Sequence, residues 1–282
     1  MTELHYFKRR CVNLLGQALA VIATLFTLLW LGWLLWTLVS HGWQALGLDT
    51  FLMDTPPPSV EGGLRNAIIG SLLLCVTGVL VGAPVGVLAA TWLAEYGRSS
   101  HLAACIRFVN DVLLSAPSII LGIFIYGLVV VTTGSFSGWA GALALALILI
   151  PVVVRTSEDI LVLVPDTMRE AAAALGAPRW RLIVTVVWRA ARGGMITGIL
   201  LGFARIAGET APLLFTALNN QFFNVDMGQA MANLPVVIFQ FAMSPYVDWQ
   251  QLAWGGALLI TLAILAINLV SRLVWHRKSG ER

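Results

Sequence analysis

The chain has 282 residues, of which 59% are hydrophobic and only 11% are charged, and its formal net charge is +3. Soluble globular proteins carry roughly 25% charged residues, so this composition excludes an ordinary soluble domain and indicates a membrane protein. The small positive excess is a topology signal and predicts no nucleic-acid partner. The three cysteines and four histidines are scattered, which predicts neither a disulfide framework nor a metal site.

Six apolar stretches approach the length of roughly 20 residues that an α-helix needs to cross a bilayer. We therefore expect an all-α membrane protein whose transmembrane helices lie near residues 13–39, 66–94, 112–131, 138–154, 194–217 and 252–275. The first stretch is too long for a cleaved secretory signal and is read as a retained helix. We divide the chain into an N-terminal helix with its outer loop, a five-helix core and a cytoplasmic tail, with the bounds 1–65, 66–275 and 276–282.

The basic residues between these stretches predict the orientation, because cytoplasmic segments of membrane proteins collect Lys and Arg. One side of the membrane receives nearly all of them, namely Lys8, Arg9, Arg10, Arg98, Arg107, Arg155, Arg169, Arg179, Arg181, Arg189, Arg192, Arg272, Arg277, Lys278 and Arg282. The opposite side offers a single arginine among several carboxylates, namely Arg65 with Asp49, Asp54, Glu61, Asp226 and Asp248. Both termini are therefore predicted to be cytoplasmic.

Two outer segments, 40–65 and 218–251, are long. The second contains an apolar run from Val236 to Met243 that is too short to span and lies between Pro235 and Pro245. The run predicts a short docking or interfacial helix. A segment that merely rests on the bilayer surface fits these residues equally well.

The largest cytoplasmic segment, 155–193, contains a short alanine-rich sequence with helix signals at both ends. Thr167 and Glu170 have the Thr-x-x-Glu spacing of a capping box, in which each side chain bonds the backbone of the other residue. Gly176 and the proline two residues later predict the end of the helix. A helix of about two turns is marginal alone in water, so it needs support from its flanks or from another protein. A plain connector between two spans remains open on these residues.

The letters of this helix resemble the EAA loop of type I ABC-importer permeases. The residues that carry the resemblance are Glu170, Ala171, Ala172 and Gly176. It implies a coupling helix that docks in a cleft of a separate ATPase subunit. The chain departs from the family's usual Leu-Pro ending, where it has Trp188 and Arg189, so we expect a helix that continues into the fifth span. The chain has no G-x-x-x-x-G-K-[ST] phosphate loop, so ATP and Mg²⁺ are expected in a partner and no cofactor in this chain.

The fifth span contains an arginine and a glutamate four residues apart, Arg205 and Glu209, followed by Thr210. A charge at bilayer depth costs about 2.5–3.5 kcal/mol on insertion scales, so such residues mark polar pathways. On a continuous helix the pair shares one face with three glycines, Gly194, Gly198 and Gly202. Glycines at this spacing predict close helix packing, and the charged pair is expected on the same packed face.

Two interpretations of the pair remain open. It is either an i, i+4 ion pair that neutralises itself and fixes a helix contact, or a contact for a passing anion. In the second case Arg205 binds the anion, and Glu209 prevents it from being held too tightly. Glu209 can also accept a hydrogen bond from protonated phosphate, which sulfate does not offer.

The stretch from Ala204 to Ala217 resembles the signature of the PstA family, a membrane subunit of bacterial phosphate-specific ABC importers. Further motifs follow in the expected order, namely Arg65-Asn-Ala-Ile, Gly82-Ala-Pro-Val-Gly86 and Ser115-Ala-Pro-Ser118. The resemblance implies a multi-pass protein of the bacterial inner membrane that imports inorganic phosphate. It also implies a PstC-like permease partner, a PstB-like ATPase dimer and a PstS-like periplasmic phosphate-binding protein. Arg205, Glu209 and Thr210 are implied to lie on the substrate pathway.

Several alternatives remain. The sister PstC-type subunit shares the Gly-Glu-Thr motif but usually lacks the Ala-Pro-Leu-Leu that this chain has at 211–214. A permease for sulfate or molybdate would use the same architecture. An ATP-independent channel or secondary carrier would explain the charged pair but not the EAA helix. A membrane-embedded enzyme would need a cluster of His, Cys or carboxylate residues within the spans, which the sequence does not predict.

Overall fold

The computed structural model describes residues 2–98 and 100–279, and every regular element in these residues is helical. Five helices are long and apolar enough to cross a membrane. They are α1 (Thr2–Ala45), α3 (Arg65–Glu95), α7 (Gly138–Val162), the helix of α9 (Arg179–Leu182) and α10 (Trp188–Ile206), and α13 (Val247–Ser279). A sixth span exists only if the bent pair α4 (His101–Ser115) and α5 (Ser118–Ile125) counts as one. Residues 280–282 of the predicted tail, Arg282 among them, lie outside the described residues.

The predicted third span, 112–131, is wrong as a straight helix. α4 and the helical segment that begins with α5 meet at an angle of 104°. The break lies at Ala116 and Pro117, because a residue before proline is pushed out of the α region into extended backbone, which Ala116 adopts with ψ 135°. α5 continues through a π-helical turn into α6 (Val131–Thr133). Asn110 ties α4 to α7 by donating to the Pro151 carbonyl.

The fourth and fifth spans also differ from their predicted bounds. α7 runs on to Val162, and the next span begins at Arg179, so the connection between them, predicted to be cytoplasmic, covers 163–178 rather than 155–193. The helix does continue from Arg179 through a π-helical turn into α10, as the missing proline indicated. The predicted fifth span, 194–217, is wrong at both ends, since it begins earlier and stops at Ile206.

α7 is the central helix of the fold, with 72% of its apolar window buried inside the chain. α3 lies against it along a ladder of glycines. A Cβ atom at Gly86 would lie 2.8 Å from the Val153 side chain, and one at Gly78 would lie 3.2 Å from Leu145. Only glycine permits such a close approach of two helices. The main core therefore forms where α3, α7 and α10 meet.

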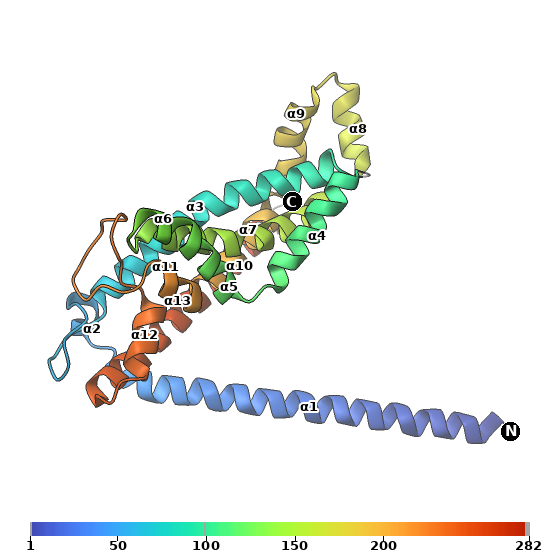
Figure 1. Ribbon diagram of the computed structural model, residues 1–282. Coiled ribbons are helices and arrows are strands. Elements are labelled where there is room, and N and C mark those ends of the chain that lie inside the picture. Colours follow the sequence, from blue (N-terminus) through green and yellow to red (C-terminus); the bar gives the residue numbers. More distant parts are fainter. Residues whose placement is uncertain (1, 99, 280–282) are drawn as a thin grey trace.

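One end of the molecule carries α2 (Leu48–Leu52), α11 (Ala211–Thr216) and α12 (Leu234–Ala242), opposite α8 (Asp166–Ala174) and α9 (Figure 1). α12 is buried along one side, and Phe241 stacks on Trp249 of α13 with ring centroids 4.4 Å apart. Asn233 caps α12 by accepting a hydrogen bond from the Val236 N–H. The short helix predicted here is present. It packs in the protein, so the alternative of a segment resting on the bilayer is wrong.

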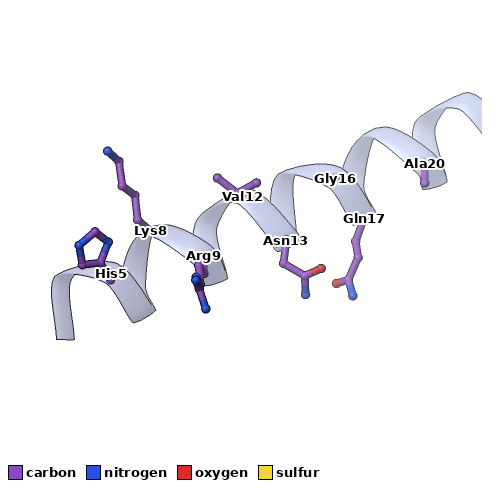
Figure 2. A pocket seen from close by; sticks show the side chains of 8 residues that line it. All are labelled: His5, Lys8, Arg9, Val12, Asn13, Gly16, Gln17 and Ala20. Carbon is purple, nitrogen blue, oxygen red and sulfur yellow. The ribbon is translucent and has the colours of Figure 1, made fainter. Parts of the chain in front are cut away.

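α1 contacts the rest of the chain only near its C-terminal end. Gly42 packs on Leu258, and His41 lies against Trp254 with ring centroids 5.1 Å apart. The remainder extends away from the body (Figure 1), and none of its apolar window is buried. An open groove with basic groups lies near its beginning (Figure 2) and is lined by His5, Lys8, Arg9, Val12, Asn13, Gly16, Gln17 and Ala20.

Candidate functional site

The fifth span breaks at the point where the charged pair was predicted. α10 ends at Ile206, Glu209 lies in non-helical backbone, and α11 begins at Ala211. Pro212 explains the break, because it has no N–H to donate to the Gly208 carbonyl and its ring would clash with that carbonyl in a continuous helix. The single stripe of glycines and charges expected along one helix is therefore wrong at its C-terminal end.

Arg205 and Glu209 do not form the ion pair that was one of the two interpretations. The ion pairs found among the described residues, with N···O up to 4.0 Å, do not join these two side chains. Arg205 is exposed in the isolated chain, while Glu209 and Thr210 are half-buried. Arg205 is thus not on the packed face, contrary to expectation. Because an arginine that faces lipid at this depth is costly, its exposed side is suited to a polar pathway or a partner subunit.

The three glycines of α10 lie along α7. A Cβ atom at Gly194 would lie 2.6 Å from Ile160, and one at Gly202 would lie 2.5 Å from the Leu149 side chain. Gly198 lies against Thr156, with similarly little space. The arginine near the end of α10 is therefore carried by a helix whose position is fixed by direct contact with the central helix.

The two broken spans meet beside the charged segment. A Cβ atom at Gly122 of α5 would lie 2.5 Å from the Pro212 Cα atom of α11. Non-helical backbone at membrane depth is tolerated only where protein buries it or where it lines a water-filled cavity, because lipid cannot bond the freed N–H and C=O groups. The contact therefore places α5, which follows the first break, against the start of α11, which follows the second.

The short helix predicted before Gly176 is present as α8. Glu170 and Ala171 are exposed, and Ala172 is half-buried against the cluster formed by α7, α9 and α10. Gly176 ends the helix with φ 77°, a left-handed conformation. Its N–H donates to the Ala173 carbonyl at 2.9 Å, and the following N–H of Ala177 donates to the Ala172 carbonyl at 3.3 Å. These two bonds are a Schellman motif.

The predicted capping box at the start of α8 is wrong. The helix begins at Asp166, so the N-cap position belongs to Pro165, two residues before Thr167, and no side chain makes a cap bond there. Asp166 is held there by ion pairs with Arg98 at 3.2 Å and with Arg169 at 3.1 Å. Arg98 is the main cause that lowers the pKa of Asp166 below its ordinary value, so this exposed carboxylate is charged at neutral pH. Thr167 therefore lies inside the first turn and does not cap it.

A buried ion pair that sequence reasoning did not find joins α8 to α3. Arg169 donates from Nη2 to Glu95 Oε1 at 2.7 Å, and the two side chains are 12% and 6% exposed. Arg179 packs over the Tyr96 ring and donates to the Glu95 carbonyl. Since 74 residues separate Glu95 from Arg169, no local pattern in the sequence indicates that they meet.

The chain matches a family of known proteins and close relatives over most of its length. The model of the binding-protein-dependent transport system inner membrane component family matches residues 82–276. Proteins named phosphate transport system permease protein PstA from Pasteurella multocida and Haemophilus influenzae are each 54% identical to the chain. The first match covers 99% of this chain and 100% of the relative, and the second covers 98% of both.

Solved structures of ABC transporters share the fold. A bacterial alginate ABC transporter aligns with a TM-score of 0.67 over 96% of this chain and 97% of that one, at 14% identity. The MetNI methionine ABC transporter aligns with a TM-score of 0.58 over 74% of this chain and 91% of that one, at 18% identity. The predicted fold of an ABC-importer permease is thereby confirmed. This fold and the near-complete match to its relatives together show that the chain belongs to the PstA family of binding-protein-dependent transport system inner membrane components.

Proposed function

We propose that this multi-pass inner-membrane protein is the permease subunit of an ATP-driven importer and forms one half of a translocation pathway for inorganic phosphate. The observation that carries the proposal is the near-full-length similarity to relatives that are named phosphate transport permeases. The sister subunit and permeases for other oxyanions are disfavoured by the same similarity. An ATP-independent channel or carrier is disfavoured by the fold shared with ABC transporters.

In this proposal the ATPase acts on the chain through α8. Glu170 and Ala171 present an exposed surface on a short helix that projects at one end of the molecule (Figure 1). A PstB-like ATPase dimer binds ATP and Mg²⁺, and its closure moves α8. The positive charges near α8 assign this end to the cytoplasm, together with both termini. ATP hydrolysis is assigned to this partner, since the sequence has no G-x-x-x-x-G-K-[ST] phosphate loop.

Arg205, Glu209 and Thr210 form this subunit's contribution to the substrate pathway. The exposed guanidinium of Arg205 offers several N–H donors in a planar fork that matches the oxygens of phosphate. Glu209 reduces the net positive charge and accepts a hydrogen bond from the protonated oxygen of HPO₄²⁻, and the Thr210 hydroxyl can donate or accept a hydrogen bond. A PstC-like subunit faces the exposed side of Arg205 and completes the pathway.

A PstS-like binding protein delivers phosphate to the opposite end, where the two outer segments contact one another. Asn66 joins them, since its side-chain amide donates to the Asn220 carbonyl at 3.0 Å and to the Gln221 carbonyl at 3.2 Å. Its carbonyl oxygen accepts the Thr55 N–H at 3.1 Å. This network gives the outer end a defined shape on which a soluble protein can dock.

The test is phosphate uptake by the assembled complex in proteoliposomes. ATP is supplied inside them, on the side of the membrane where the ATPase subunits bind it. Wild-type complex should accumulate phosphate and should leave sulfate and molybdate outside. Arg205→Gln should reduce phosphate uptake at least tenfold, because it removes the cation that meets the anion. Arg192→Gln is the matched control, since it removes an exposed arginine from the same helix away from the break.

Two results would contradict the proposal. Uptake of sulfate or molybdate in preference to phosphate would show a different substrate. Phosphate flux that continues without ATP or without an ATPase subunit would show a channel or a secondary carrier. Unchanged uptake by Arg205→Gln in a complex that retains its ATPase would remove Arg205 from the pathway while leaving the transporter assignment intact.

A further inference from the structure

We infer that the buried pair of Glu95 and Arg169 is the joint through which α8 moves the membrane helices. Both are positioning residues, since neither touches ATP or phosphate. The inference rests on the proposed function, in which α8 receives the motion of an ATPase. It adds a route for that motion, from α8 into the cytoplasmic ends of α3 and α7.

The contacts of Arg169 join three elements through one side chain. Its Nε and Nη2 atoms donate to the Glu95 carboxylate at the end of α3, at 3.1 Å and 2.7 Å from Oε1. Nη2 also donates to the Leu161 carbonyl at 2.9 Å, and Nη1 donates to the Val164 carbonyl. These carbonyls belong to the C-terminal turn of α7 and the residues after it, where carbonyl groups lack partners within the helix. One guanidinium therefore holds the ends of α3 and α7 to α8.

α8 has little else to hold it. None of its nine residues is fully buried, and its two links to the neighbouring helices are the short stretches 163–165 and 175–178. A helix of this length is marginal without packing. In contrast, Arg169 and Glu95 are almost completely removed from solvent in the isolated chain. The ion pair is therefore the most buried polar attachment of α8, beside the half-buried Ala172 and the exposed pair of Asp166 with Arg98.

Motion that reaches α3 and α7 cannot easily be lost between them. The close approach at Gly78, Gly82 and Gly86 keeps α3 in direct contact with α7. α10 is also packed on α7, through Gly194 and Gly202. A displacement of α8 therefore moves α3 and α7 together and, through α7, the helix that carries Arg205.

The test compares Glu95→Gln with the wild type in the complete importer, reconstituted in proteoliposomes. The measured quantity is phosphate transported per ATP hydrolysed, with co-purification of the ATPase recorded for each variant. Glu95→Gln keeps the shape of the side chain and removes its charge, so the ATPase should still bind and hydrolyse ATP. We expect the transport ratio to fall at least tenfold. A role limited to holding the fold would lower assembly and leave the ratio of assembled complexes unchanged.

The matched control is Asp159→Asn. It removes a carboxylate from another ion pair at the cytoplasmic end of α7, formed with Arg155 at 3.5 Å, but both side chains there are more than half exposed. Exposed pairs contribute little, so the control should keep the transport ratio within twofold of the wild type. If Glu95→Gln fails to assemble, Arg169→Lys is measured instead, since it retains the charge but loses the forked contact and should also lower the ratio.

The outcomes separate this inference from the function on which it rests. If the wild-type complex moves no phosphate, the proposed function fails. If the wild type transports phosphate and Glu95→Gln does so with an unchanged ratio, the joint is refuted while the function stands. If neither Glu95→Gln nor Arg169→Lys assembles with the ATPase, the pair is a folding requirement and the inference is likewise refuted.

Discussion

Leu149 of α7 offers a direct test of how tightly the three central helices are packed. Its side chain is fully buried and lies between two glycines of different helices. A Cβ atom at Gly202 of α10 would lie 2.5 Å from Leu149 Cδ1, and one at Gly82 of α3 would lie 3.0 Å from Cδ2. A leucine can usually turn away from one added methyl group. Here a turn away from α10 drives it toward α3.

The expected magnitudes follow from this geometry. Gly202→Ala should destabilise the chain by about 1–3 kcal/mol, the usual cost of overpacking, and Gly82→Ala should cost less because its contact is longer. The two together should cost at least about 1 kcal/mol more than their sum, since Leu149 then has no direction of escape. Leu149→Ala alone should cost about 2–5 kcal/mol through the cavity it leaves. In the background of both alanines, the same change should stabilise the chain.

The assay is thermal unfolding of the purified chain in detergent, followed by helical circular dichroism. For a chain of this size 1 kcal/mol corresponds to a shift in Tm of roughly 2–4 °C. Gly32→Ala is the control, because nothing lies within 4 Å of a Cβ atom at that position of α1. Additive effects of the two alanines, or a destabilising Leu149→Ala in their background, would refute the clamped arrangement.

Three further predictions concern α8. Thr167→Ala should change the affinity of the chain for its ATPase less than twofold in a titration, because Thr167 does not cap the helix; a loss comparable to that of Gly176→Ala would contradict this. Gly176→Ala should destabilise α8 by about 1 kcal/mol, since φ 77° is unfavourable for alanine, and hydrogen exchange of the α8 amides should rise accordingly. The pKa of Asp166 is lowered in the folded chain, mainly by Arg98. Its stabilising contribution is thus complete above the ordinary value of 3.8 and is lost as the pH falls through the lowered pKa; acid titration of Asp166→Asn should lack this component, and an unchanged titration would refute it.

The sequence predicted the long helices well because apolar length is a property of consecutive residues. The spacing of Gly194, Gly198 and Gly202 indicated a packed face, and the structure places that face on α7. The Gly176 helix end was predicted for the same reason, since a left-handed C-terminal residue is a local requirement. A pattern of neighbouring residues was sufficient to predict a feature wherever that feature depends on neighbouring residues alone.

The errors came from treating two interrupted spans as continuous helices. Pro117 and Pro212 were the available signals, and each removes a backbone donor that a straight helix requires. The predicted face of Glu209 depended on an unbroken helix, so it was wrong once α10 ended at Ile206. Arg205 lies before that break, on the same helix as the three glycines, and Pro212 does not account for its exposure. The contact of Arg169 with Glu95 had no local signal, because only tertiary packing brings the ends of α3 and α8 together.

The break after α10 changes the electrostatics of the proposed phosphate contact. Arg205 now lies in the last turn of a helix, where unpaired carbonyls carry a partial negative charge of roughly half an elementary charge. An anion that approaches Arg205 therefore meets a cation opposed both by this helix end and by the carboxylate of Glu209. A pathway must bind its ion strongly enough to admit it and weakly enough to release it. The helix end weakens the site even without Glu209. Glu209→Gln should therefore slow phosphate release less than it would if Glu209 were the only negative charge that opposes Arg205.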